Sequence, residues 1–180
     1  IEQSTEFNET MQLYKSVNDA KDIAMSEKFL RLFTKKYPQN PIGSLLLAEQ
    51  MFNLGDHKKA ILLYSKSLEN HKLQPIIVPQ TLWLCYDGLG MCNGITGKYG
   101  QSLRYLDKGY ELANSMGSEM HIVTSSYNLA CLYAETNKTK EALVYLSKAI
   151  KLNPRKKDDA RTDSSFRNMK NDSRFNKLVR

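Results

Sequence analysis

Three cysteines and three histidines are the residues of this chain best suited to binding a metal ion or to nucleophilic chemistry. Metal sites and catalytic thiols need such residues at short spacings, as in CxxC or HExxH. The sequence contains neither pattern, so we expect no metal ion and no cofactor. Cys85, Cys92 and Cys131 lie within apolar segments and are interpreted as buried free thiols. His57, beside a Gly-Asp turn, and His71, near a helix end, are expected to be exposed.

A second chemical candidate is the segment GMCNGITGKYG, which contains a Gly-Lys pair. A phosphate-binding loop needs a further glycine five residues before the second glycine, and Ser or Thr directly after the lysine. Cys92 and Tyr99 occupy these two positions. We therefore expect no nucleotide at this segment.

Other patterns that support catalysis or nucleic-acid binding are also missing from the sequence. No serine or cysteine stands in a nucleophile motif with a histidine base, which favours a non-enzymatic protein. The basic residues 155–157 are followed at once by Asp158 and Asp159, and no aromatic residues alternate with basic ones as in nucleic-acid modules. We expect no nucleic-acid partner.

The composition is that of a globular protein, with 41% hydrophobic and 25% charged residues. No run of about 18 apolar residues occurs, so we expect no membrane span. Free thiols favour a reducing compartment, and we therefore expect a cytoplasmic protein. Because the chain begins at Ile1 rather than at Met, an exported protein with a removed signal stays an alternative, as do further domains before Ile1.

The elements that position these residues follow from an internal repeat, because three segments align without a gap. They read PIGSLLLAEQMFNLGDHKKAILLYSKSLEN, WLCYDGLGMCNGITGKYGQSLRYLDKGYEL and VTSSYNLACLYAETNKTKEALVYLSKAIKL. Equivalent residues are offset by 42 and then by 40 positions. Five columns keep these offsets: Leu47-Ala48, Leu89-Gly90 and Leu129-Ala130; Gly55, Gly97 and Asn137; Ala60, Ser102 and Ala142; Tyr64, Leu106 and Leu146; Ser67, Gly109 and Ala149.

Each unit has the pattern of two antiparallel helices joined by a tight turn. Leu129 and Tyr133, four residues apart, share one face of the first helix. The turn column holds Gly or Asn, the residues that adopt a left-handed backbone most easily. In the second helix, Ala142 and Ala149 share a face where a close helix crossing leaves room only for small side chains. The pattern predicts an all-α fold of helical hairpins.

The third unit, YNLACLYAETNKTKEALVYLSKAIKLNP, resembles a tetratricopeptide repeat. The middle unit is a looser match, with Asn93 where the family has an apolar or aromatic residue and with no closing proline. The resemblance covers about residues 41–154 and implies an α-α solenoid, a superhelix of antiparallel hairpins. The matching residues are Leu129, Ala130, Tyr133, Ala142, Leu146, Ala149 and Pro154 in the third unit, and Leu47, Ala48, Gly55, Ala60, Tyr64 and Ser67 in the first.

Units of this family span about 34 residues. The longer offsets in this chain place extra residues between hairpins, at HKLQPIIVPQ and NSMGSEMHI. They indicate a long-unit variant of the family, with longer helices and an offset connection.

The resemblance further implies that the first helix of each unit lines a concave groove for a protein or peptide. Members of the family that hold acidic C-terminal tails use Lys, Arg and Asn on this wall, whereas this chain has Asn128 with no inward Lys or Arg and carries two acids, Glu49 and Asp87. We expect an apolar or amphipathic partner with a basic residue. The expected groove residues are Ile42, Leu45, Glu49, Phe52, Leu84, Asp87, Met91, Tyr127, Asn128 and Cys131, together with Thr124 and Ala134.

Other interpretations stay open at this point. The groove residues can instead pack against the chain's own flanks, such as the N-terminal hairpin. With an accessible groove, the chain is predicted to be a monomeric, non-enzymatic scaffold for protein or peptide binding. The alternatives are a peptide-sensing regulatory module, although residues 1–40 are too short for the DNA-binding domain that such regulators carry, and a helical accessory domain of a larger protein.

The flanks complete the predicted organisation. Residues 1–40 are interpreted as a degenerate helical hairpin, followed by units at about 41–82, 83–122 and 123–154 and by a basic cap at 155–180. In the cap, Asp163 and Asp172 suit the N-caps of two short helices. Phe166, Met169, Phe175 and Leu178 share one narrow face that is predicted to cover the last hairpin.

The net charge of +7 is concentrated at the C-terminal end. Residues 138–180 contain 13 Lys or Arg against 5 Asp or Glu, whereas residues 1–137 contain 13 against 14. The excess is either a solvated basic end or a contact for an acidic partner, nucleic acid or an anionic membrane surface.

Overall fold

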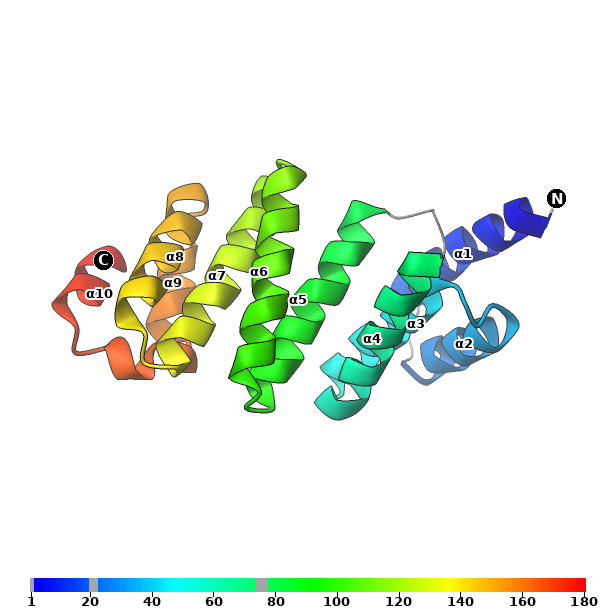
Figure 1. Ribbon diagram of the computed structural model, residues 1–180, viewed down its shortest axis with the longest axis horizontal. Helices are drawn as coiled ribbons and strands as arrows, with labels where there is room; N and C mark the ends of the chain where they lie inside the picture. The colour runs from blue at the N-terminus through cyan, green and yellow to red at the C-terminus, as the bar shows by residue number, and fades with distance from the viewer. Residues whose placement is uncertain (1, 20–22, 74–77) are drawn as a thin grey trace. The chain divides into compact units, whose positions relative to one another are not determined.

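The computed structural model describes residues 2–19, 23–73 and 78–180, and these ranges form helices and turns without a strand (Figure 1). The all-α prediction is confirmed. The helices are α1 (Glu2–Asp19), α2 (Ile23–Lys36), α3 (Pro41–Asn53), α4 (His57–Leu73), α5 (Pro79–Ile95), α6 (Tyr99–Ser115), α7 (Glu119–Glu135), α8 (Thr139–Leu152), α9 (Lys156–Thr162), the 3-10 helix η1 (Ser164–Met169) and α10 (Ser173–Leu178).

The chain divides into two compact units, residues 1–92 and residues 93–180, and the division falls within α5. Unit 1 contains α1 to α4 and most of α5, and unit 2 contains the end of α5 and all later helices. In each unit, consecutive helices pack as antiparallel pairs, consistent with a tetratricopeptide-type helical array. The pairs α3–α4 and α7–α8 are the most extensive of these contacts.

Tight turns inside the hairpins follow the predicted column. Gly55 and Gly97 have φ angles of 79° and 77°, and Asn137 has a φ angle of 59°. These values lie in the left-handed region, which Gly enters without steric cost and Asn more easily than most residues. The prediction for these three turns is confirmed. Gly117, between α6 and α7, adopts the same conformation with a φ angle of 60°.

The extra residues at the end of the second sequence repeat lie mostly within the helices α6 and α7. Only residues 116–118 connect α6 to α7, and each of these helices has 17 residues. The stretch NSMGSEMHI, which was expected to lie between hairpins, is mostly helical, and the long-unit variant of the family stays a prediction. The connection that follows α4 includes residues outside the described ranges.

The core of unit 2 lies between α7, α8 and the C-terminal segment. Ala142, Leu146 and Ala149 are fully buried on one face of α8, as the repeat columns predict. Phe166, Met169 and Phe175 pack into the same cluster and are at most 2% exposed. Figure 1 shows this end of the chain, in orange and red, beside α8.

Two aspartates start the helices of this C-terminal segment, as predicted. The side chain of Asp163 accepts a hydrogen bond from the Ser165 amide and begins η1. The side chain of Asp172 accepts one from the Arg174 amide and begins α10. Side-chain hydrogen bonds from Arg174 also lower the pKa of Asp172 to about 2. These caps satisfy backbone amides that the short helices leave unpaired.

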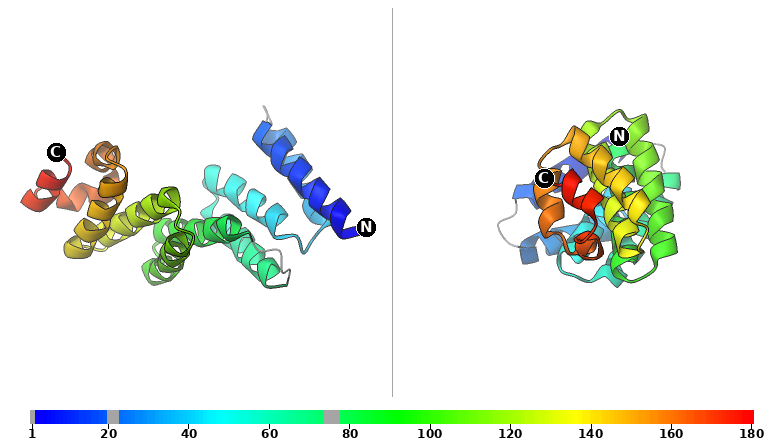
Figure 2. Two further views of the ribbon diagram at one scale, coloured as in Figure 1. Left: turned by 90° about the horizontal axis from the view of Figure 1, so that it is seen from above. Right: turned by 90° about the vertical axis from the view of Figure 1, so that its left-hand side faces the viewer.

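Helices α1 and α2 form the N-terminal hairpin of unit 1 and lie side by side (Figure 2). Lys36 of α2 pairs with Glu9 of α1 at 2.7 Å. Asn40 links the hairpin to α3, because its side-chain amide donates to Glu6 while its oxygen accepts from the Ile42 amide. A small apolar cluster also joins α2 to α3; its buried members are Leu30, Phe33 and Leu46.

Candidate partner-binding surface

A half-buried acid lies among the expected groove residues of unit 1. Glu49 of α3 accepts a hydrogen bond from the hydroxyl of Tyr64 of α4 at 2.5 Å, and Tyr64 is only 1% exposed. Burial raises the pKa of the Glu49 carboxyl, while the hydrogen bond from Tyr64 partly offsets the effect. Burial also raises the pKa of the Tyr64 hydroxyl, which therefore stays protonated and acts as the donor.

Hydrogen bonds tie α5 to the helices beneath this surface. The thiol of Cys85 in α5 donates to the Ser67 hydroxyl of α4 at 3.2 Å, and that hydroxyl donates to the Pro41 carbonyl of α3 at 2.8 Å. Polar groups of three helices are thus satisfied in the interior. The relay fixes α3, α4 and α5 of unit 1 against one another.

The thiols of the chain are free and poorly suited to nucleophilic chemistry. Cys85 and Cys92 are buried, and burial raises the pKa of each thiol to about 12. Burial raises the pKa of Cys131 as well, although this residue is partly exposed. A thiol reacts as its thiolate, so these groups are unreactive near neutral pH. The interpretation as buried free thiols is confirmed for Cys85 and Cys92.

The structure divides the seven expected groove residues of unit 1 into two groups. Leu45 is 0% exposed and Asp87 is 9% exposed, so both offer a partner almost no surface. Leu45 fails as a groove residue because it is part of the core. The other five are half-buried on α3 and α5, and together they are called the α3–α5 face: Ile42, Glu49, Phe52, Leu84 and Met91.

In unit 2, the chain's own C-terminal segment covers the expected groove residues of α7. Tyr127 is 8% exposed, its hydroxyl donates to Asp163 Oδ2 at 3.0 Å, and its ring meets Phe166 edge-on at 5.8 Å. The sulfur of Cys131 lies 3.6 Å from the same carboxylate oxygen. Tyr127 therefore does not face a partner. The flank that packs on α7 is the C-terminal segment rather than the N-terminal hairpin.

The other expected groove residues of α7 are also either buried or half-buried. Ala134 is 1% exposed within the core of unit 2, so placing it on an accessible wall was wrong. Asn128 and Thr124 are half-buried. The resemblance implies that these residues share a wall of α7, but it does not indicate how much of that helix the C-terminal segment covers.

The two histidines that were expected to be exposed are not. His71 is 2% exposed, because α4 continues to Leu73 and Thr81 of α5 lies against the ring, with 3.4 Å between Thr81 Oγ1 and His71 Nε2. Burial lowers the pKa of His71, which favours the neutral ring. His57 is half-buried, with its ring 5.3 Å from that of Phe52.

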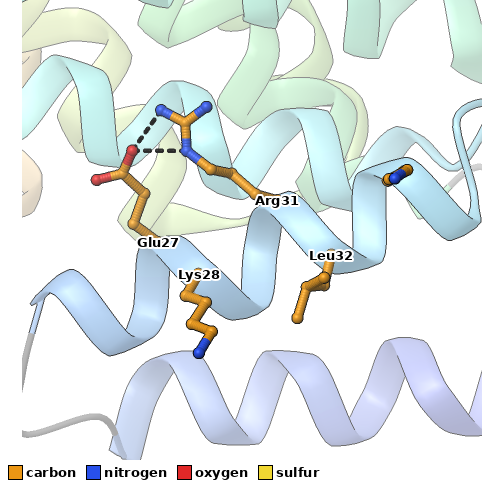
Figure 3. A pocket seen from close by; sticks show the side chains of 5 residues that line it. Glu27, Lys28, Arg31 and Leu32 are labelled. Carbon is orange, nitrogen blue, oxygen red and sulfur yellow. Dashed lines mark hydrogen bonds and ion pairs between the residues drawn. The ribbon is translucent and has the colours of Figure 1, made fainter.

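A hollow of about 390 Å³ along α2 was not predicted. Lys28 and Leu32 point from α2 towards the side of α1, whereas Glu27 and Arg31 pair on the opposite side (Figure 3). Exposed apolar residues continue along this part of α2, and their spacing of four and then three residues was a sequence signal of a second helix face. They are Met25, Phe29 and Leu32.

The described ranges were compared with the requirements of a metal site and of a membrane-spanning helix. No three His, Cys, Asp or Glu side chains gather there in a way that could hold a metal ion. A search of the described helices for a membrane-spanning stretch also finds no candidate.

Comparison with known families supports the resemblance drawn from the repeat columns. Residues 123–156 match the tetratricopeptide repeat family, and this range covers most of α7, all of α8 and the turn that follows. Comparison with curated proteins finds no match. The chain thus carries a tetratricopeptide repeat within an all-helical array of paired helices.

Proposed function

We propose that this chain, which carries a tetratricopeptide repeat, is a non-enzymatic scaffold that binds a protein or peptide segment on the α3–α5 face of unit 1. Repeats of this family typically mediate protein binding. Unit 2 is less suited to this role, because its C-terminal segment already occupies the corresponding residues of α7.

Half-buried apolar side chains on a rigid support carry the proposal. Phe52, Leu84 and Met91 keep part of their surface accessible. Aromatic and Met side chains contribute strongly to binding when a partner removes them from water. Because Ser67 and Cys85 lock α3, α4 and α5 together behind them, the face needs little reordering on binding.

Glu49 defines the polar part of the expected ligand. Its carboxylate is half-buried and receives one hydrogen bond, from Tyr64, and burial raises its pKa. A cationic group next to it would restore the charged form. An amphipathic helix or extended segment with one Lys or Arg between apolar residues satisfies both parts of the face.

The experiment is selection from a displayed peptide library, followed by calorimetry on the selected peptides. Met91→Ala is expected to weaken binding by about 2 kcal/mol, roughly thirtyfold, if Met91 is central to the contact. Leu62→Ala is the matched control, because Leu62 is 70% exposed on α4 and lies outside the α3–α5 face. Circular dichroism of both variants separates loss of binding from loss of fold.

The amino-acid composition of the selected peptides gives a second readout. Enrichment of apolar residues with a single Lys or Arg agrees with the chemistry of the face. Equal loss of affinity in Met91→Ala and Leu62→Ala, or no loss in either, places the binding surface elsewhere and contradicts the proposal.

A further inference from the structure

A second surface, independent of the α3–α5 face, lies at the C-terminal end of unit 2. It is a hollow of about 480 Å³ bordered by α9, by the turn after η1 and by α10. Two of its lining residues, Phe175 and Val179, are at most 5% exposed and anchor it in the core of unit 2. The other lining residues are polar or charged: Arg161, Lys170, Asn176 and Arg180.

Hydrogen bonds hold the border of this basic hollow in place. The side-chain amide of Asn176 donates to the Lys170 carbonyl at 2.9 Å, which ties α10 to the preceding turn. Lys157 of α9 donates to the Arg180 carbonyl at 3.0 Å and ties Arg180 to α9. Both bonds use backbone carbonyls as acceptors, so they leave the positive charges of Lys170 and Arg180 in place.

The carboxylates nearest in sequence already have partners. Asp158 pairs with Arg161, Asp159 with Lys156 and Asp172 with Arg174. Asp163 accepts from the Tyr127 hydroxyl and the Ser165 amide. Glu141, the remaining acid of residues 138–180, lies at the start of α8.

Among the described residues, two cations of the hollow have no ion-pair partner. None of the ion pairs formed by the described residues includes Lys170 or Arg180, and both residues are exposed. The hollow is lined by these two cations and by Arg161, which pairs with Asp158, and residues 138–180 around it have an excess of basic residues. Such a surface attracts and retains negative charge.

We propose that the basic hollow binds an acidic segment of a partner protein, with two or more Asp or Glu side chains placed between Arg161, Lys170 and Arg180. Its volume is that of a site for a few side chains. Arg161 and Arg180 present planar guanidinium groups, which pair with carboxylates through two hydrogen bonds.

Nucleic acid fits the hollow less well. Proteins that bind single strands supply exposed aromatic rings for base stacking along a basic groove. The aromatic ring of this hollow, Phe175, is 2% exposed and belongs to the core. The three cations line a single hollow of about 480 Å³, a size that suits a short acidic peptide.

The test measures fluorescence anisotropy of labelled octaglutamate, of a single-stranded oligonucleotide of equal charge and of vesicles containing anionic phospholipid. The variant carries Lys170→Glu and Arg180→Glu. The control carries Lys59→Glu and Lys66→Glu, which change the net charge equally at exposed positions of α4 in unit 1. Circular dichroism confirms that both double variants are folded.

Octaglutamate binding is expected to weaken by about tenfold in the hollow variant and by less than about twofold in the control, with the difference shrinking at high salt. Equal weakening in both variants, or unchanged binding in the hollow variant, overturns the proposal. Tighter binding of the oligonucleotide or the vesicles than of octaglutamate, when it depends on Lys170 and Arg180, also overturns it and assigns the hollow to that other partner.

Discussion

The ring of Tyr64 lies so close to the α-carbon of Gly88 that a Cβ atom built on Gly88 would stand 2.2 Å from Tyr64 Cζ. The ring cannot retreat freely, because Tyr64 is 1% exposed and its hydroxyl bonds to Glu49. Gly88→Ala is therefore expected to lower the free energy of unfolding by about 1–3 kcal/mol through overpacking, despite the better helix propensity of Ala. Urea unfolding measures the change.

Gly100→Ala is the matched control for this prediction. Gly100 lies in the first turn of α6, and a Cβ atom built there meets nothing within 4 Å. The substitution is expected to be neutral or to stabilise by up to about 1 kcal/mol, because Ala favours a helix over Gly. Similar losses of stability in both variants would contradict the close approach of Tyr64 to Gly88.

Tyr127→Phe tests the attachment of the C-terminal segment to α7. The change removes the hydroxyl that donates to Asp163 and keeps the ring that packs on Phe166. Loss of one hydrogen bond to a half-exposed carboxylate is expected to cost about 1 kcal/mol of unfolding free energy. Tyr99→Phe is the control, since Tyr99 is 43% exposed. Equal melting temperatures of the wild type and Tyr127→Phe would show that this bond contributes nothing.

Deletion of residues 159–180 tests the capping role of the same segment. It removes Phe166, Met169 and Phe175 and uncovers the buried face of α8 around Leu146. An exposed apolar end in a helical array favours end-to-end association. The truncated chain is expected to self-associate or precipitate in gel filtration. A monomer with an unchanged melting temperature would mean that the segment does not cap the hairpin.

Glu49 is expected to make the free energy of unfolding depend on pH. Burial raises its pKa in the folded chain above the unfolded value, so folding favours the protonated form. Its contribution to stability is fully present below the unfolded pKa of about 4.3 and is lost as the pH rises through the folded pKa. Glu49→Gln, which imitates the protonated form, is expected to match the wild type near pH 4 and to exceed it at pH 7.

Urea unfolding of both proteins between pH 4 and pH 8 measures this difference. Glu69→Gln removes the same charge at an exposed position of α4 and is the control. A Glu49→Gln variant that is less stable than the wild type at pH 7 would mean that the charged carboxylate is favoured in the folded state.

Reactivity of the thiols follows from their burial. Cys85 and Cys92 have pKa values of about 12. Near neutral pH, each therefore holds about a thousandfold less thiolate than a thiol with the usual pKa of 9.0 would. Iodoacetamide followed by mass spectrometry is expected to label both residues in guanidinium chloride and neither in native buffer. Rapid labelling of Cys85 in native buffer would reveal local opening of α5.

Local requirements of the backbone were predictable from the sequence. The turns at Gly55, Gly97 and Asn137 need a left-handed conformation, and few residue types adopt it easily. The caps at Asp163 and Asp172 involve amides two residues away. In each case the cause and its effect are close neighbours in the chain, so the residue type is enough to predict the structure.

The candidate surface was predictable only in part. The resemblance to the repeat family implied that Glu49, Phe52, Leu84 and Met91 line the first helices of their hairpins, and all four keep some exposed surface. The resemblance could not exclude Leu45, because one helix face passes continuously from the core to the surface.

By itself, the sequence determined the helices of the repeats and the tight turns inside the hairpins, since these depend on residues up to about four positions apart. The pairing of helices into hairpins followed from the repeat columns and the resemblance that they carry. Only the tertiary structure decided what lies opposite each helix face. Tyr127 is covered by Asp163 and Phe166, more than 35 residues later in the chain. Gly88 lies against Tyr64, whereas Gly94 of the same helix faces Ser102. The helical period predicts which residues share a helix face, but the burial of that face depends on side chains from distant segments that pack on it.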